Sequence, residues 1–172
     1  MIVTNLNMKK EHDILFKPII WAYIKEYNKA GDAHVKKKLK EGLKDTLKKW
    51  SDQKVKMISK SVYHRAQTKY PEIDPFELMW PQRNKMGKVK YEGKNPKSWL
   101  VWEHTTPLAE LFETLIKCTS ETDVSKTMKN YSGVCWISRK EDDLLNKNKY
   151  RSKRPGGWKK CYKECGIYLV SR

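Results

Sequence analysis

Five apolar side chains recur every three or four residues in a segment that is otherwise crowded with lysine. They are Val35, Leu39, Leu43, Leu47 and Trp50. This spacing places all five on one face of an α-helix and leaves the lysines on its other faces. Such a stripe has to be buried, so the chain is expected to fold around packed helices whose outer surface is strongly basic.

The same helical spacing precedes this segment, and we predict helix from Lys9 to about Tyr70. The first helix is marked by Ile14, Leu15, Ile19, Ile20, Tyr23, Ile24 and Tyr27. Pro18 is expected in a first turn or at a break, because proline has no N–H to donate inside a helix. Gly31-Asp32 predicts the connection to the second helix.

Residues 71–98 separate this helical part from a different back part. The segment holds four of the seven prolines and two of the glycines, which predicts an irregular chain with one polar hairpin around Lys88–Tyr91. Trp99–Trp102 is a short apolar run typical of a strand, and we expect it to end at Glu103. Thr106 followed by Pro107 predicts the start of a helix that continues to about residue 116.

The final third alternates again between helix and strand. Apolar spacing indicates a short helix over 120–130, and 134–137 is a second apolar strand. Ser138 follows as a helix N-cap, and Glu141 three residues later completes a capping box, so a helix is expected from Arg139 to about Asn146. Residues 150–157 predict a basic loop.

The charge of the chain indicates its partner. Lys and Arg number 37 against 20 Asp and Glu, which gives a formal net charge of +17. Charge of this size attracts polyanions, so nucleic acid is the leading partner. No apolar stretch reaches the length of a membrane span, and Met1–Lys10 lacks the apolar run of a secretory signal. We therefore expect a soluble, intracellular (cytoplasmic) protein that does not associate with a membrane.

The four cysteines, Cys118, Cys135, Cys161 and Cys165, are expected to be reduced thiols, because their spacing is irregular and no secretory signal precedes them. Cys161 and Cys165 would share a helix face. No CxxC pair is present, however, which argues against a structural zinc site.

Two segments of the back half carry a resemblance to a known superfamily. Residues 102–107 read Trp-Glu-His-Thr-Thr-Pro, and residues 135–142 read Cys-Trp-Ile-Ser-Arg-Lys-Glu-Asp. This order resembles the HNH, or ββα-metal (His-Me finger), nucleases, in which the first strand delivers an acid-His pair and the last helix another metal ligand. The tail from Arg154 to Trp158, followed by Tyr162 and Gly166-Ile167, is similar to the ending of HNH-type restriction and phage endonucleases.

The resemblance implies that His104 is the general base that activates water and that Glu103 is a metal ligand beside it. A histidine pKa of about 6.5 suits proton removal at neutral pH. Asp142 is the expected helix ligand, with Glu141 second because the capping box already engages it. The metal would be Mg²⁺ or another divalent cation such as Mn²⁺, which prefer carboxylate oxygens. Glu103 and His104 converge only if the strand bends there, because a strand alternates its faces.

Two positions depart from the superfamily pattern. Glu103 stands where Asp is more usual before the His. Asn130 is the candidate for the Asn that orients the His, although its spacing to the strand is not tight. The zinc-knuckle cysteines that flank many HNH motifs are absent as well.

The resemblance completes the expected fold and function. We expect one domain over 1–172, of α+β class and predominantly helical, with N-terminal helices and a C-terminal ββα-metal motif. Residues 1–70 would contact DNA and residues 99–168 would hold the catalytic part. The implied activity is hydrolysis of phosphodiester bonds in double-stranded DNA, most simply as a sequence-specific type II restriction enzyme, with a phage or homing nuclease next. Cutting both strands of a symmetric site would suit a homodimer.

Two basic segments are candidate DNA contacts. Their residues are Lys36, Lys37, Lys40, Lys44, Arg151, Lys153 and Arg154. Basic helices commonly contact phosphates, although a solvated helix face or loop accounts for the same residues equally well.

Other interpretations compete with this one. Asp74, Glu92 and Lys94 satisfy the loose spacing of a PD-(D/E)XK nuclease, but the segment around Glu92 is polar and contains Gly and Pro, unlike a buried strand. Gly166-Ile167-Tyr168 is like the start of a GIY-YIG nuclease but comes too close to the C-terminus. The alternative from a different class is a non-catalytic nucleic-acid-binding protein that uses basic helices and scattered aromatic side chains.

Overall fold

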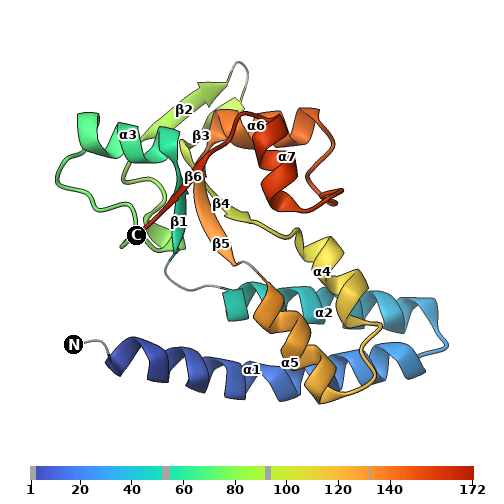
Figure 1. The fold of residues 1–172 in the computed structure, drawn as a ribbon. Helices are drawn as coiled ribbons and strands as arrows, with labels where there is room; N and C mark the ends of the chain where they lie inside the picture. The colour runs from blue at the N-terminus through green and yellow to red at the C-terminus, as the bar shows by residue number, and fades with distance from the viewer. Residues whose placement is uncertain (1–2, 52–54, 92–93, 132) are drawn as a thin grey trace. The chain divides into compact units, whose positions relative to one another are not determined.

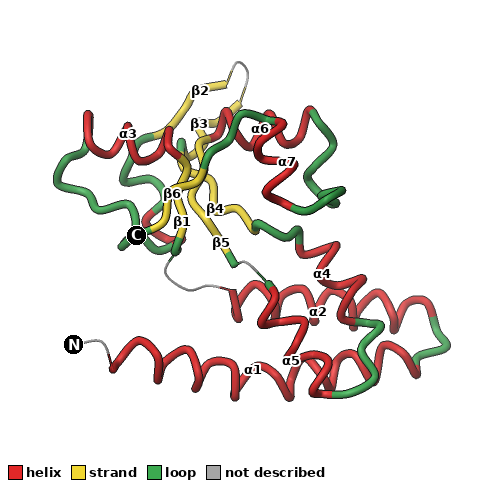
Figure 2. The backbone as a smooth tube through the Cα atoms, viewed as in Figure 1, coloured by secondary structure: helices red, strands yellow, loops and turns green. Residues whose placement is uncertain are grey.

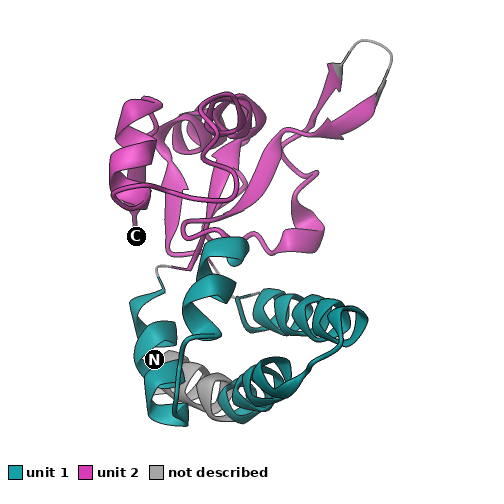
Figure 3. Ribbon diagram, turned by 90° about the vertical axis from the view of Figure 1, so that its right-hand side faces the viewer, with its two compact units in different colours: residues 1–51, 108–131 teal, residues 52–107, 132–172 magenta. Residues whose placement is uncertain are grey.

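The chain forms two compact units. The computed structural model describes residues 3–51, 55–91, 94–131 and 133–172, with the side chains of 15–51, 55–90, 95–131 and 133–172. Unit 1 comprises residues 1–51 and 108–131, and unit 2 comprises residues 52–107 and 132–172 (Figure 3). A helical segment of unit 1 is therefore inserted between two strands of unit 2.

The described regular elements of unit 1 are helices joined by loops (Figure 2). Its elements are α1 (Val3–Lys29), α2 (Ala33–Ser51), α4 (Leu108–Leu115) and α5 (Glu121–Asn130). α1 packs against α2 and α5, and α4 packs against α2 and α5 (Figure 1).

The core of unit 1 draws on all four helices. Its buried side chains include Ile20, Ile24, Leu43, Leu47, Trp50, Leu111, Phe112, Leu115, Val124 and Met128. Gly42 of α2 lets the Tyr23 ring pack closely against the helix, because a Cβ at this position would come within 2.7 Å of the ring. Within the lysine-rich helix, the buried stripe begins at Leu43, whereas Leu39 is half-buried and Val35 is exposed.

Unit 2 is built around a four-stranded sheet in the order β4-β5-β1-β6. The strands are β1 (Met57–Ser59), β4 (Leu100–His104), β5 (Val134–Ser138) and β6 (Leu169–Ser171). β5 pairs antiparallel with β4 and parallel with β1, and β1 pairs antiparallel with β6. Strands β4 and β5 pair along their full length, from Leu100 opposite Ser138 to His104 opposite Val134.

Helices cover both faces of this sheet (Figure 1). On one face, α3 (Lys60–Lys69) and the chain that follows it share a core whose members include Ile58, Val62, Met86, Leu100, Val134 and Trp136. On the other face, α6 (Arg139–Lys147) and α7 (Trp158–Glu164) share a core of Cys135, Ile137, Leu145, Tyr162 and Ile167. Successive side chains of β5 therefore alternate between the two cores, as a strand buried on both faces requires.

A second, two-stranded antiparallel sheet belongs to unit 2. It consists of β2 (Lys88–Tyr91) and β3 (Lys94–Ser98), with a short 3-10 helix, η1 (Trp80–Gln82), before it. This hairpin is the one that the turn residues of the 71–98 segment predict.

The structure confirms the α+β class and most elements of the back half. The helices over 108–115, 121–130 and 139–147 and the strand over 134–138 follow the predicted bounds to within about two residues. The capping box between Ser138 and Glu141 is present. Strand β4 continues through Glu103 to His104, two residues beyond the apolar run, because both residues keep their pairing with β5.

Three expectations for the first 70 residues are wrong. Pro18 lies inside α1, which continues through it to Lys29. Residues 57–59 form β1 rather than helix, because β5 and β6 offer backbone partners on both sides. Helix α3 belongs to unit 2, so residues 1–70 do not form one helical part. The predictions also missed α7 and β6 near the C-terminus.

Among the described residues, no helix is both long enough and apolar enough to cross a membrane.

The capping box predicts a measurable stability effect. Ser138→Ala removes the hydroxyl that accepts from the Glu141 N–H and donates to the Glu141 carboxylate. We expect unfolding in urea to show a loss of about 1–2 kcal/mol, as for other N-cap serines. Ser152→Ala, in an exposed loop of the same unit, should change stability by less than about 0.5 kcal/mol. Equal midpoints for the two variants would contradict a structural role for the box.

Candidate functional site

Glu103 lies on the face of the sheet that α6 and α7 cover. It stands opposite Cys135 in the register of β4 with β5, and Cys135 belongs to the core beneath these two helices. The alternation of side chains along β4 thus directs Glu103 toward α6 and α7. This placement is the first step in assembling a site.

Arg154 reaches Glu103 from the loop between α6 and α7. Its side chain is 1% exposed. Its guanidinium donates to the Glu103 carboxylate, to the backbone oxygen of Thr105, and to that of His104 at 2.7 Å. The guanidinium carbon also lies 5.0 Å from the centre of the Tyr162 ring. Arg154 therefore fastens the 150–157 loop to the end of β4 and places a positive charge beside Glu103.

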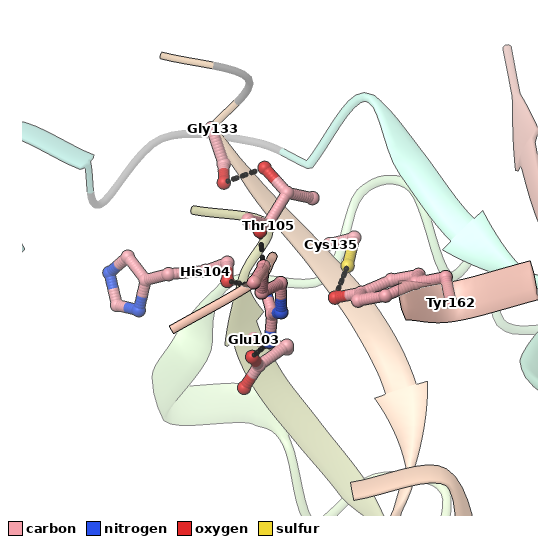
Figure 4. A network of polar contacts seen from close by, with 7 residues as sticks. Glu103, His104, Thr105, Gly133, Cys135 and Tyr162 are labelled. Atoms are coloured by element: carbon pink, nitrogen blue, oxygen red, sulfur yellow. Dashed lines mark hydrogen bonds and ion pairs between the residues drawn. The ribbon is translucent and has the colours of Figure 1, made fainter. Parts of the chain in front are cut away.

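A buried thiol and a buried phenol, those of Cys135 and Tyr162, lie beside this ion pair. The Tyr162 hydroxyl and the Cys135 thiol lie 3.6 Å apart (Figure 4). Burial raises the pKa of Cys135 to about 12 and raises that of Tyr162 well above its ordinary value, so both stay protonated at neutral pH. Burial also raises the pKa of Glu103, and the charge of Asp142 adds to this, while Arg154 and Arg151 lower it.

The first turn of α6 supplies two further carboxylates with different roles. The Glu141 Oε2 accepts from the Ser138 N–H at 2.7 Å, and from the hydroxyls of Ser138 and Ser59 at 2.8 Å each. This oxygen holds β1, β5 and α6 together, so Glu141 acts as the helix cap; its place as the second choice of metal ligand stays a prediction. Asp142 pairs with Arg139 at 3.1 Å and is near enough to Glu103 to affect its pKa.

His104 lies on the opposite face of the sheet from Glu103. It stands opposite Val134, which belongs to the core beneath α3. The Glu103 carboxylate and the His104 imidazole point in different directions (Figure 4). The bend that would bring them together does not occur, because β4 stays paired through His104. The structure thus brings Glu103 and Asp142 to one face and does not bring His104 to them.

Asn130 is the last residue of α5 and is exposed. It belongs to unit 1, whereas Glu103, His104 and Asp142 belong to unit 2. Its proposed role in orienting His104 stays a prediction.

The candidate DNA contacts differ in how available they are. Lys36 lies over the Tyr27 ring, and Lys40 lies over the Phe112 ring and pairs with Glu113 at 3.5 Å. The other candidates in unit 1 are Lys37, which is exposed, and Lys44, which is half-buried.

In unit 2, Arg151 and Lys153 are exposed. The prediction that Arg154 contacts DNA is wrong. Its side chain is buried against Glu103 and two backbone oxygens, so it has no surface to offer DNA.

The structure describes only part of the competing nuclease patterns. Asp74 accepts from the Phe76 N–H and pairs with Arg172 at 3.1 Å. Glu92 and the side chain of Lys94 lie outside the described residues, and the Lys94 backbone belongs to the two-stranded sheet. In the GIY-YIG-like segment at residues 166–168, Ile167 is a core residue while Tyr168 is exposed.

The cysteines do not gather into a zinc site within the described part of the chain. All four are free, and Cys118, Cys135 and Cys161 are buried. No group of three or more His, Cys, Asp or Glu side chains there has metal-binding geometry.

Cys135, Tyr162 and Arg139 belong to the site but were not predicted. Strand pairing alone brings Cys135 beside Glu103, and no sequence spacing reports that pairing. Tyr162 carried a faint signal, since the similar tail includes it, but its contact with Arg154 depends on α7 folding back onto the sheet.

Comparison of the chain with known protein families, with curated proteins and with solved structures gives no match. The functional argument therefore depends on the site itself.

The Glu103–Arg154 pair predicts a pH-dependent stability defect. Arg154→Met leaves Glu103 buried without its counter-charge, which should cost about 3–5 kcal/mol at pH 7. The loss of Arg154 raises the pKa of Glu103 further. A buried carboxyl with a raised pKa loses stability as the pH rises above its ordinary 4.5, so the defect should shrink toward acid pH. Urea unfolding between pH 4.5 and 8 measures it.

Two companion variants separate this effect from general damage. Glu103→Gln in the Arg154→Met background should recover part of the stability and remove the pH dependence. Lys153→Met, the exposed neighbour, should stay within about 0.5 kcal/mol of the parent protein. A defect that is independent of pH, or that Glu103→Gln fails to relieve, would show that Arg154 acts through packing alone.

Proposed function

We propose that the protein is a metal-dependent endonuclease of double-stranded DNA, centred on the sheet face that holds Glu103 and Asp142. One observation carries the proposal: the register of β4 directs the Glu103 carboxylate toward the face that α6 covers, and the first turn of α6 holds Asp142. Arg139, Arg151 and Arg154 supply positive charge around them. Carboxylates for a metal, with the exposed Arg151 for a phosphate, are parts that phosphodiester hydrolysis needs.

The order of elements supports the same proposal. β4 and β5 are antiparallel, and α6 begins directly after β5. This is the strand, strand, helix order that the resemblance to ββα-metal nucleases implies. The proposal differs in one residue, because Glu103 rather than His104 faces the helix. His104 is therefore left out of the proposed centre.

The donor set fits a hydrated divalent cation. Arg154 binds Oε1 of Glu103 and Arg139 binds Oδ2 of Asp142, and the second oxygen of each carboxylate is the proposed metal ligand. Mg²⁺ is commonly held by one or two protein carboxylates, with water and substrate phosphate completing its shell. Glu103 and Asp142 would hold the ion, which would supply charge stabilisation to the phosphate and acidify bound water.

The distribution of charge favours unit 2 as the DNA-binding unit. Its sequence contains 22 Lys and Arg against 10 Asp and Glu, whereas unit 1 contains 15 against 10. The excess therefore lies mainly in the unit that holds the candidate centre. Arg151 is exposed in the loop that Arg154 fastens to β4, which supports a contact between Arg151 and a phosphate there. A restriction-type role, with a homodimer on a symmetric site, remains the form of the proposal that the family resemblance implies.

A second candidate function is non-catalytic binding of nucleic acid. It is favoured by the arginines themselves, because Arg154 and Arg139 already compensate the two carboxylates without any metal. The described residues also contain no group of three metal-binding side chains. Under this alternative the site is a structural ion-pair network and the basic surface does the work.

Plasmid cleavage decides between the two functions. We expect supercoiled DNA to be nicked or linearised with Mg²⁺ or Mn²⁺ and to stay intact in EDTA. Asp142→Asn and Glu103→Gln should each lower the rate by more than about 100-fold, since even an outer-shell partner of a metal is worth 10–100-fold. Asp143→Asn, the neighbouring carboxylate on α6, serves as the matched control and should cleave like the parent protein.

His104→Ala tests the location of the centre. We expect it to retain cleavage, because the imidazole lies on the opposite face of the sheet. Loss of cleavage in a folded His104→Ala protein, with Asp142→Asn unaffected, would move the centre to His104. No cleavage with any metal or DNA tested, together with firm DNA binding, would favour the non-catalytic alternative.

A further inference from the structure

The β2–β3 hairpin is a basic ribbon that projects from the rest of unit 2 (Figure 3). Lys88 and Lys90 of β2 and Lys97 of β3 are exposed. Lys97 lies opposite Val89, so it belongs to the other face of the ribbon from Lys88 and Lys90. Both faces of the hairpin therefore carry lysine.

The root of the ribbon is held firmly. Arg65 of α3 stacks on the Trp99 ring at 4.4 Å and on the Tyr70 ring at 5.5 Å, and donates to the Met86 backbone oxygen. The Trp99 N–H donates to the backbone oxygen of Gly87. Gly87 has a positive φ, and a Cβ there would come within 3.0 Å of the Tyr70 hydroxyl.

A second contact ties the ribbon to the basic chain before it. The Ser98 hydroxyl donates to the backbone oxygen of Arg83 at 2.6 Å. The guanidinium of Arg83 stacks 3.8 Å from the centre of the Trp80 ring, and Trp80 is 46% exposed. Lys85 is exposed between this stack and β2. The root thus adds two more basic side chains to the same end of the molecule.

Lysines on an exposed hairpin also guard its edges against pairing with other strands. Protection of the edges alone would need only a few charges. It would not need the base of the hairpin to be fixed to α3, because a two-stranded hairpin adds little stability by itself. This ribbon has lysine on both faces, a stacked arginine as anchor and further basic groups at its base. Those features together favour a rigid, basic surface that binds an anionic partner.

We propose that the β2–β3 ribbon enters a groove of duplex DNA, with Lys88 and Lys90 contacting backbone phosphates. The major groove is wide enough to admit a two-stranded ribbon, and phosphates flank it on both sides. Duplex is favoured over single strands because Arg83 already covers one face of Trp80, which lessens its use as a base-stacking platform. This inference rests on the proposed DNA substrate, which the ribbon would bind.

Salt-dependent binding tests the ribbon separately from catalysis. Fluorescence anisotropy with a labelled duplex of about 20 base pairs, in EDTA, gives the slope of log affinity against log salt. Lys88→Gln with Lys90→Gln should weaken binding at low salt and reduce the slope by about 2, because each phosphate contact contributes about 0.9. Lys126→Gln with Lys129→Gln, an equal charge change on exposed lysines of α5, should leave the slope unchanged.

The outcomes are distinguishable from those of the cleavage assay. A reduced slope for the hairpin variant alone supports the ribbon even if the parent protein cleaves nothing. Equal slopes for the two double variants overturn the ribbon even if the protein is an active nuclease. Tighter binding to a single strand or to RNA of the same length than to the duplex would also overturn it.

Discussion

The pairing of β4 with β5 is the constraint on which the rest of unit 2 depends. Five consecutive residue pairs hold the two strands in one register, from Leu100–Ser138 to His104–Val134. Because side chains alternate across a sheet, this register assigns every residue of β4 to one of two cores. A shift of one residue would send Glu103 to the face of α3 and His104 to the face of α6. The chemistry available to the site follows from that single choice of register.

Two polar networks secure the elements around this pairing. Arg154 joins the 150–157 loop to the end of β4, and the Glu141 carboxylate joins α6 to β1 and β5 through Ser59 and Ser138. Both networks use charged groups that are shielded from water, where hydrogen bonds to charge are strong and unpaired charge is costly. They also divide the acidic residues by role. Glu141 caps α6, whereas Glu103 and Asp142 each pair with an arginine.

The basic character of the chain is not spread evenly between the two units. Unit 1 compensates part of its charge by short-range ion pairs on its helices, such as Lys48 with Asp45 and Lys38 with Glu41. Unit 2 carries the larger excess and includes the exposed Lys88, Lys90 and Lys97 of the ribbon. Unit 2 also forms ion pairs, such as Arg139 with Asp142, but a net positive charge on the unit with the candidate centre suits a protein that acts on DNA, since phosphates dominate the affinity.

Most helices and strands were predictable from the sequence, but the strands and helices that they pair with or pack against were not. The apolar spacing of α2 and α4, the Ser138–Glu141 box and the turn residues before the hairpin act over a few neighbouring residues, so the sequence by itself determined these elements. Strand β1, the extension of β4 through His104 and the docking of α7 depend on partners far along the chain. Only the tertiary structure decided that Glu103 and Asp142 share a face while His104 does not, because strand register is a long-range choice that no local pattern reports.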